Sequence, residues 1–156
     1  MIAPEWEAEP RESNCLTRQI DHPLVCALKP HYGHGLMTRM VARLVELAGL
    51  PRELRERLRL LGGLPEGTRS AGDGGGVGLG VVEAARGRLF HRVRLEGERI
   101  AQYQILAPTE WNFHSRGVVA QGLLGLSLRD TESLRRQAAL LISAVDPCVG
   151  YRLKVA

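Results

Sequence analysis

With 156 residues, 44% of them hydrophobic, the chain fits one globular domain with a buried core, and it contains no apolar run long enough to span a bilayer. Its net charge of +4 rests on arginines that alternate with glutamates, and no nucleic-acid-binding motif accompanies them, so we expect no nucleic-acid partner. Three isolated cysteines form no disulfide framework and no signal peptide opens the chain, so we expect a cytoplasmic protein without membrane insertion.

The first part of the chain has no clear periodicity. Residues 1–14 are polar and interrupted by proline, which predicts a flexible tail ahead of a single domain over residues 15–156. Two prolines and a glycine interrupt residues 15–34, which we expect to be irregular. This segment also carries two cysteines and three histidines: Cys15, His22, Cys26, His31 and His34. Their spacing lacks the short Cys-x-x-Cys pair of structural zinc, so an irregular segment is favoured over a zinc site, and their role stays open.

Two helices and a loop are predicted next. Apolar side chains on one face and arginines on another predict a helix over Leu36–Leu47. Gly49 is expected to end it, and Pro51 suits the first turn of a second helix. That second helix carries leucines at helical spacing as far as Leu61. Pro65–Gly76, rich in glycine and serine, predicts a loop, and the glycines after it lack the Lys-Ser/Thr of a phosphate-binding loop.

The second half of the chain predicts strands and then helices. Apolar and alternating patterns indicate three strands, over Val77–Ala84, Arg88–Leu95 and Arg99–Leu106. A loop over Ala107–His114, a helix over Ser115–Leu124 and a helix over Glu132–Val145 follow. Asp130 or Thr131 can cap the last helix, and Pro147 stops it. The predicted fold class is therefore α+β, with helices flanking a three-stranded antiparallel meander.

Three segments of this second half together resemble one known family. Gly80–His91 contains Glu-Ala-Ala-Arg-Gly, Tyr103–Asn112 contains Pro-Thr-Glu-Trp-Asn, and Asp146-Pro-Cys148 follows the last helix. In order and approximate separation they resemble the Glu-Ala-Pro-Arg-Gly element, the Pro-Thr/Ser-Thr-Trp-Asn loop and the start of the Asp-Pro-Cys-x-x-Cys-x-x-His terminus of the nickel–iron hydrogenase large subunit. The resemblance covers about residues 36–154 and implies the C-terminal part of that subunit.

The resemblance also implies which side chains would face a metal unit. In the family, an arginine and a hydroxyl residue lie over the cyanide and carbonyl ligands of iron, and a terminal cysteine binds metal. Carried over by position, the cofactor-binding residues are Arg86, Pro108 and Thr109, and the metal ligand is Cys148. Two alternatives stay open: Cys148 as an ordinary buried thiol, and Arg86 as a turn residue that pairs with Glu83.

The chain departs from the family pattern at the residues that would hold nickel. Tyr151 stands where the family has its second terminal cysteine, Lys154 stands where it has a histidine, and Ala85 replaces the motif proline. The family's N-terminal cysteine pair is absent, since Cys15 and Cys26 are isolated. A phenol and an ammonium group do not replace a terminal thiolate. We therefore expect that this chain alone neither holds nickel nor catalyses hydrogen turnover.

These departures resemble the non-catalytic accessory branch of the family, of the HupK and HoxV type. That resemblance implies a scaffold in hydrogenase maturation, with transient binding of an Fe(CN)2(CO) unit. It implies two partners, a maturation metallochaperone and the hydrogenase large subunit. One alternative is a truncated or split large subunit that completes its site with another chain. The other is a protein-interaction module that binds no metal.

Overall fold

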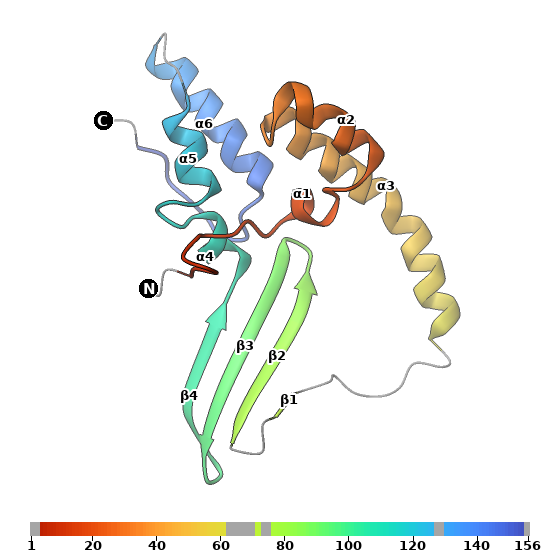
Figure 1. Ribbon diagram of the computed structural model, residues 1–156, viewed down its shortest axis with the longest axis vertical. Coiled ribbons are helices and arrows are strands. Elements are labelled where there is room, and N and C mark those ends of the chain that lie inside the picture. Colours follow the sequence, from red (N-terminus) through yellow and green to blue (C-terminus); the bar gives the residue numbers. More distant parts are fainter. Residues whose placement is uncertain (1–3, 62–70, 73–75, 127–129, 155–156) are drawn as a thin grey trace.

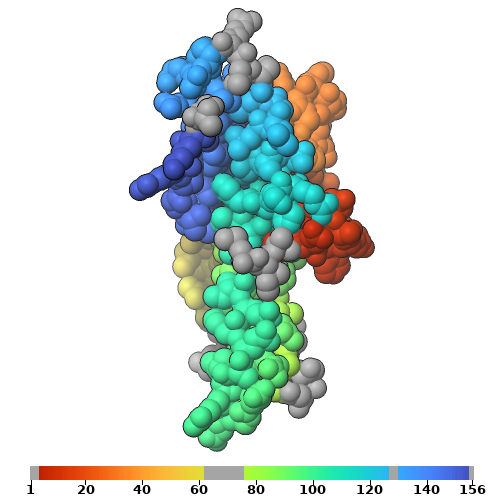
Figure 2. All heavy atoms as spheres, turned by 90° about the vertical axis from the view of Figure 1, so that its left-hand side faces the viewer, coloured from red at the N-terminus to blue at the C-terminus, as the bar shows by residue number. Residues whose placement is uncertain are grey.

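The computed structural model describes residues 4–61, 71–72, 76–126 and 130–154, and its helices gather at one end while a sheet projects from the other (Figure 1). In chain order the elements are α1 (Cys15–Arg18), α2 (Pro23–Tyr32), α3 (Leu36–Leu60), β1 (Ala71–Gly72), β2 (Val77–Ala84), β3 (Gly87–Glu96), β4 (Arg99–Leu106), α4 (Pro108–Asn112), α5 (Val118–Leu124) and α6 (Thr131–Val145). Figure 2 shows the same division from the side, with the sheet as a narrow extension below the helices. The predicted α+β class, with helices flanking an antiparallel meander, is confirmed.

The segment expected to be irregular forms two helices instead. The Asn14 side chain caps α1 by accepting the Leu16 N–H at 2.9 Å. His22 caps α2 with its ring nitrogen, and Pro23 occupies the first helical position, where the missing N–H is not needed. The expectation was wrong because prolines at a helix start were treated as breakers; Pro30 lies inside α2, in its last turn.

One continuous helix, α3, replaces the two that were predicted. The expected break at Gly49 and Pro51 is wrong, because helical structure runs from Leu36 to Leu60 with Pro51 inside it. Proline removes one backbone hydrogen bond and tends to kink a helix. The leucines, arginines and glutamates on both sides of Pro51 are good helix formers, which favours a helix that continues past it. The buried residues of α3, Thr38, Arg39 and Ala42, all lie in its first half. Of the predicted loop over Pro65–Gly76, residues 65–70 and 73–75 lie outside the described residues, and Ala71–Gly72 form the short strand β1 instead of loop.

The meander matches the prediction closely. Strands β2, β3 and β4 pair in sequence order and antiparallel, and the short β1 adds to the outer edge of β2. Gly97 makes the β3–β4 turn with a φ of +61°, a conformation that glycine adopts without strain. Exposed apolar side chains line much of the sheet, among them Val81, Val82, Ile100 and Ile105. The sheet is therefore only partly covered by the described chain.

The C-terminal helices build one of two small cores. Helix α6 spans Thr131–Val145 and is capped by Asp130, as predicted. Its buried side chains pack against α5 through a cluster of Val119, Ile142 and Val145. A second cluster joins α1, α2 and α3 through Leu16, Val25 and Ala42. The predicted loop before α5 contains the short helix α4, and α5 begins at Val118 rather than Ser115. None of the helices in the described ranges is long and apolar enough to cross a membrane.

Residues 4–14 lie against the body of the molecule. Glu12 forms a double ion pair with the guanidinium of Arg39, which is only 3% exposed. The backbone of Ser13 exchanges two hydrogen bonds of 2.9 Å with the side-chain amide of Asn112, and Glu5 pairs with Arg116. The division into a flexible tail over residues 1–14 and a domain over 15–156 stays a prediction, while these contacts tie the segment to three separate helices and loops.

Candidate functional site

A sharp turn after α6 presents Cys148. Asp146 ends the helix in the left-handed conformation, with a φ of 60°, which aspartate tolerates better than most residues. Pro147 follows and cannot continue the helix. The turn sends the chain back toward α4 and leaves the Cys148 thiol exposed. The alternative of a buried structural thiol is therefore wrong.

Thr109 of α4 lies directly beside this thiol. Its Oγ1 is 3.0 Å from Cys148 Sγ, within hydrogen-bonding distance. Both side chains line an open cavity of about 610 Å³, whose wall also includes Ala107, Glu110, Phe113, His114, Ser115 and Tyr151. Pro108 is buried at the first position of α4, where it fixes the start of the helix that carries Thr109. Two predicted site residues, Thr109 and Cys148, are thus brought into contact.

Arg86 lies near the end of α6 and contacts Asp146, two residues before Cys148. It lies in the turn between β2 and β3, and its Nε is 3.4 Å from Asp146 Oδ2. Arg43 of α3 approaches the same carboxylate at 3.7 Å and donates to the Ser143 carbonyl at 2.9 Å. The alternative pairing of Arg86 with Glu83 is wrong, because Glu83 pairs with Arg18 and Arg88. Asp146 therefore links α3, α6 and the hairpin turn next to Cys148, but Arg86 does not line the cavity that Thr109 and Cys148 share.

The hairpin turn is held in place by Gly87. A Cβ at this position would lie 2.6 Å from the Ser13 carbonyl oxygen, and its φ of +134° is one that other residues avoid. The Arg88 N–H donates to Ser13 Oγ at 2.9 Å in the same place. Close approach of the N-terminal segment thus requires glycine directly after Arg86 and fixes where the turn sits.

Cys15 is a thiol near this region that sequence reasoning did not assign to the site. It lies beside Arg43, Arg86 and Asp146 in one small cavity. Burial raises the pKa of Cys15 to about 11, and a hydrogen bond to the Glu46 carboxylate adds to the effect. Cys15 is therefore a protonated thiol near neutral pH and is not a ready metal ligand. The sequence could not predict this position, because Cys15 belongs to no motif and its neighbours in the cavity are distant in the chain.

His114 is a second residue that the sequence did not single out. Its side chain is buried and lines the cavity that contains Cys148. The Arg116 N–H donates to its Nδ1 at 3.0 Å, so the neutral ring carries its proton on Nε2. This Nε2 has no hydrogen-bond partner among the described residues and lies 3.8 Å from Glu5 Oε1. A single histidine without a motif gave no reason to predict it.

The residues weighed for zinc do not converge. His22 serves as a helix cap, and Cys26 donates weakly to the Ile20 carbonyl at 3.4 Å. His31 and His34 are exposed at the end of α2 and just after it. Within the described part of the chain, no group of three or more histidine, cysteine, aspartate or glutamate side chains is placed to hold a metal ion.

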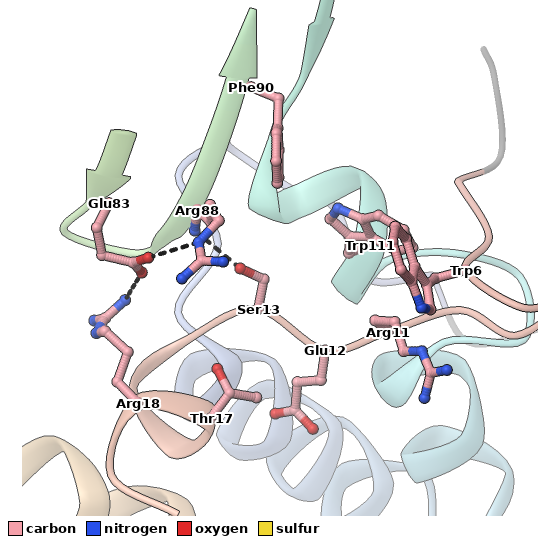
Figure 3. Close-up of a pocket in the computed structure, with 10 residues that line it drawn as sticks. All are labelled: Trp6, Arg11, Glu12, Ser13, Thr17, Arg18, Glu83, Arg88, Phe90 and Trp111. Atoms are coloured by element: carbon pink, nitrogen blue, oxygen red, sulfur yellow. Dashed lines mark hydrogen bonds and ion pairs between the residues drawn. The ribbon is translucent and has the colours of Figure 1, made fainter. Parts of the chain in front are cut away.

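A separate cavity of about 600 Å³ lies between the N-terminal segment and the hairpin (Figure 3). Trp6 and Trp111 stand side by side at one end, and Phe90 points toward them from β3. At the other end, Glu83 pairs with Arg18 and Arg88 at 3.1 Å each. None of the four predicted site residues lines this cavity. The carboxylates of Glu12 and Glu83 are already paired with arginines. We therefore interpret this cavity as a packing gap between the N-terminal segment and the hairpin, and not as a ligand site.

A family model described as nickel-dependent hydrogenase matches residues 17–151. The chain belongs to the nickel-dependent hydrogenase family. The match covers α2 to α6 and extends past Cys148, so it includes every residue that the resemblance assigned to the site.

Two relatives in this family are called hydrogenase expression/formation protein HupK. The one from Rhizobium leguminosarum bv. viciae is 33% identical, over 93% of this chain and 47% of its own length. The one from Bradyrhizobium diazoefficiens is 47% identical over 81 residues, or 51% of this chain and 22% of that protein. The chain thus spans less than half the length of these curated relatives.

A solved structure in the family shares the fold. The [NiFeSe] hydrogenase from Desulfovibrio vulgaris Hildenborough superposes with a TM-score of 0.68 at 27% identity. The superposition covers 94% of this chain and 36% of the hydrogenase chain. This chain therefore has the architecture of one part of a family member, with Tyr151 and Lys154 at the positions where the resemblance expects a cysteine and a histidine.

Proposed function

We propose that this chain is a non-catalytic accessory protein of hydrogenase maturation that holds an iron unit with cyanide and carbonyl ligands before its transfer. The cargo would be Fe(CN)2(CO), delivered by a metallochaperone and received by a hydrogenase large subunit. The observation that carries the proposal is the exposed Cys148 thiol, 3.0 Å from the Thr109 hydroxyl at the mouth of an open cavity. The HupK names of two relatives support a role in hydrogenase expression or formation.

The chemistry of the residues fits an iron cargo better than a resident nickel centre. A thiolate is a suitable soft ligand for iron, and an exposed thiolate can release it again. The Thr109 hydroxyl can donate a hydrogen bond to the thiolate or to a cyanide nitrogen. Arg86, held by Asp146 in the adjacent turn, offers further N–H donors beside the same chain terminus. Tyr151 lines the cavity where the resemblance places the second thiolate, which removes a ligand that nickel would need.

Infrared spectroscopy with metal analysis tests this proposal directly. Protein would be purified without oxygen from cells that also express the maturation proteins. We expect bound iron, cyanide and carbonyl bands, and no nickel. Cys148→Ser should remove both iron and bands, whereas Cys26→Ser should keep them, because Cys26 is also an exposed thiol but lies on α2 and does not line the cavity.

Variants of Thr109 separate ligand tuning from simple folding. Thr109→Val removes the hydroxyl and keeps the shape, so we expect retained iron with shifted cyanide bands, and Thr109→Ser should restore their position. Nickel in amounts close to one per chain would contradict the scaffold role and favour a split large subunit. Absence of metal and of all bands would instead favour an interaction module that binds no metal.

A further inference from the structure

His114 carries a buried donor that has no acceptor within the described residues. Its side chain is 3% exposed, and it lines the cavity that contains Cys148. The Arg116 N–H donates to its Nδ1 at 3.0 Å, so the neutral ring holds its proton on Nε2. This Nε2–H makes no hydrogen bond in the described part of the chain. Because an unpaired buried N–H destabilises a fold, it points to an acceptor that arrives with a ligand.

The Glu5 carboxylate marks where that acceptor would lie. Its Oε1 accepts a hydrogen bond from Arg116 Nη2 at 2.6 Å and lies 3.8 Å from His114 Nε2, beyond hydrogen-bonding distance. Arg116 and His114 thus present two donors to one negatively charged group. Pro4, directly before Glu5, lines the cavity of Cys148. The Glu5 side chain is 42% exposed, so it can turn into solvent and leave its place to an acceptor from the cavity.

The rest of the cavity wall suits a compact metal–ligand unit better than a strongly hydrated anion. Cys148 and Thr109 present a thiol and a hydroxyl 3.0 Å apart, and Phe113 and Val149 add apolar surface. The Glu110 carboxylate in this wall already accepts the backbone N–H at the start of α4, at 2.7 Å. Phosphate and sulfate lose hydration against apolar groups, whereas a cyanide on iron carries one nitrogen acceptor that a single N–H can satisfy.

We propose that His114, together with Arg116, is a second binding point of the Cys148 cavity and donates its Nε2–H to a cyanide nitrogen of an iron–cyanide ligand. The choice of ligand rests on the proposed function, whereas the donor pair follows from the geometry alone. Cys148 holds the iron, and His114 recognises one of its cyanides. Glu5 is an internal competitor that covers the donor pair until the ligand displaces it.

Hexacyanoferrate(II) tests the donor pair separately from the thiol. Every coordination site of its iron is already filled by cyanide, so Cys148 cannot bind it as a metal ligand. NMR of the full chain with isotope-labelled histidine would follow the His114 ring nitrogens, and calorimetry would give the affinity. We expect the His114 signal to shift and saturate with this probe and not with sulfate at equal ionic strength. The His91 signal should stay in place, since that ring is bonded to Tyr103 on the exposed sheet.

Substitutions at His114 and Glu5 should move the affinity for the probe in opposite directions. His114→Phe keeps a ring and the net charge but removes the donor, so we expect binding about 10-fold weaker. His114→Gln offers an amide N–H in place of Nε2–H and should recover most of this loss. Glu5→Gln should strengthen binding about 3-fold, because a neutral amide competes less for Arg116. His91→Phe is the matched control and should leave the affinity unchanged.

The outcomes separate this inference from the proposed function. Equal affinity of the unchanged chain and His114→Phe would show attraction to the basic surface alone and would overturn the inference, as would a His114 signal that does not move. Cys148→Ser should bind the probe as tightly as the unchanged chain. If the probe binds through His114 but the chain carries no iron after co-expression, the donor pair stands and the proposed function fails. If iron and its bands are present but His114→Phe alters neither the cyanide bands nor the probe affinity, the function stands and the inference fails.

Discussion

The helical body of the molecule and its projecting parts bury very different side chains. In the body, formed by residues 4–49 and α4–α6, even charged groups are enclosed: Arg39 is 3% exposed and faces Glu12. In the projecting parts, β2–β4 and residues 50–60, leucines, valines and isoleucines stay exposed while ion pairs lie on the surface. The buried apolar side chains of the described residues all lie in the body, together with the enclosed ion pair, whereas the projecting parts hold no such cluster.

This difference places the candidate site on the well-packed side. Thr109 and Cys148 belong to the body, and Arg86 lies where the sheet enters it, fixed by Asp146 and by the close approach of Ser13 to Gly87. A site that binds and releases a cargo needs donors that hold their positions.

The largest expected effect comes from breaking the enclosed ion pair. Glu12→Gln leaves the Arg39 guanidinium buried without a counter-charge, so we expect a loss of about 3–5 kcal/mol in the free energy of unfolding. Urea denaturation followed by circular dichroism would measure it. The matched control is Glu56→Gln, whose exposed pair with Arg59 should contribute at most about 1 kcal/mol. Equal losses in the two variants would remove the distinction between the regions.

The part-buried thiol of Cys15 and the exposed thiol of Cys26 should differ strongly in reactivity. Because the pKa of Cys15 is raised to about 11, its thiolate fraction near pH 8 is about 100-fold lower than that of an ordinary cysteine. We expect iodoacetamide to label Cys26 quickly and Cys15 about 100-fold more slowly, as read by peptide mass spectrometry. Labelling of Cys15 should rise with pH until about 11.

The same pKa shift predicts how stability depends on pH. The folded chain holds the Cys15 proton more tightly than the unfolded chain, and this difference stabilises the fold. The stabilisation is fully present below the ordinary cysteine pKa of 9.0. It is lost as pH rises toward about 11. Cys15→Ala should flatten the fall of stability in this window, and an unchanged pH profile would contradict the assignment.

A smaller loss is expected from Asn112→Ala. The Asn112 amide exchanges two hydrogen bonds with the Ser13 backbone, and its removal leaves a part-buried N–H and C=O unpaired. We expect a loss of about 2 kcal/mol, measured by the same denaturation. Gln102→Ala on the exposed sheet should change stability by less than about 0.5 kcal/mol. If Asn112→Ala is equally mild, residues 4–14 are not anchored as the contacts indicate.

The same division separates what local sequence patterns could predict from what they could not. Strands β2–β4 and helix α6 were predicted well, because alternation, a turn glycine and an Asp130 cap are local signals. Helices α1 and α2 were missed although their caps, Asn14 and His22, are local, because the prolines of this segment were treated as breakers. Their packing against α3 does depend on residues far apart in sequence. Gly49 and Pro51 were read as a stop and a start, whereas the helix continues through both.

The site was predictable by resemblance and only in part. Thr109 and Cys148 are in contact, although 39 residues separate them in the chain, and only a family pattern could have paired them. Arg86 was expected over the same ligands, but its partner is Asp146, a residue that had been treated only as part of a motif. His114 and Cys15 were not assigned, because burial and the proximity of Glu46 or Arg116 cannot be read from single residues.

The smallest expected effect is the sharpest test of the projecting parts. Leu58 is 60% exposed on α3, and alanine is the better helix former, so Leu58→Ala should change the stability of the chain by less than about 0.5 kcal/mol. Leu16→Ala, at a position only 2% exposed in the body, should cost about 3 kcal/mol. Equal losses from the two substitutions would show that Leu58 is packed in solution and would remove the difference in packing between the two regions.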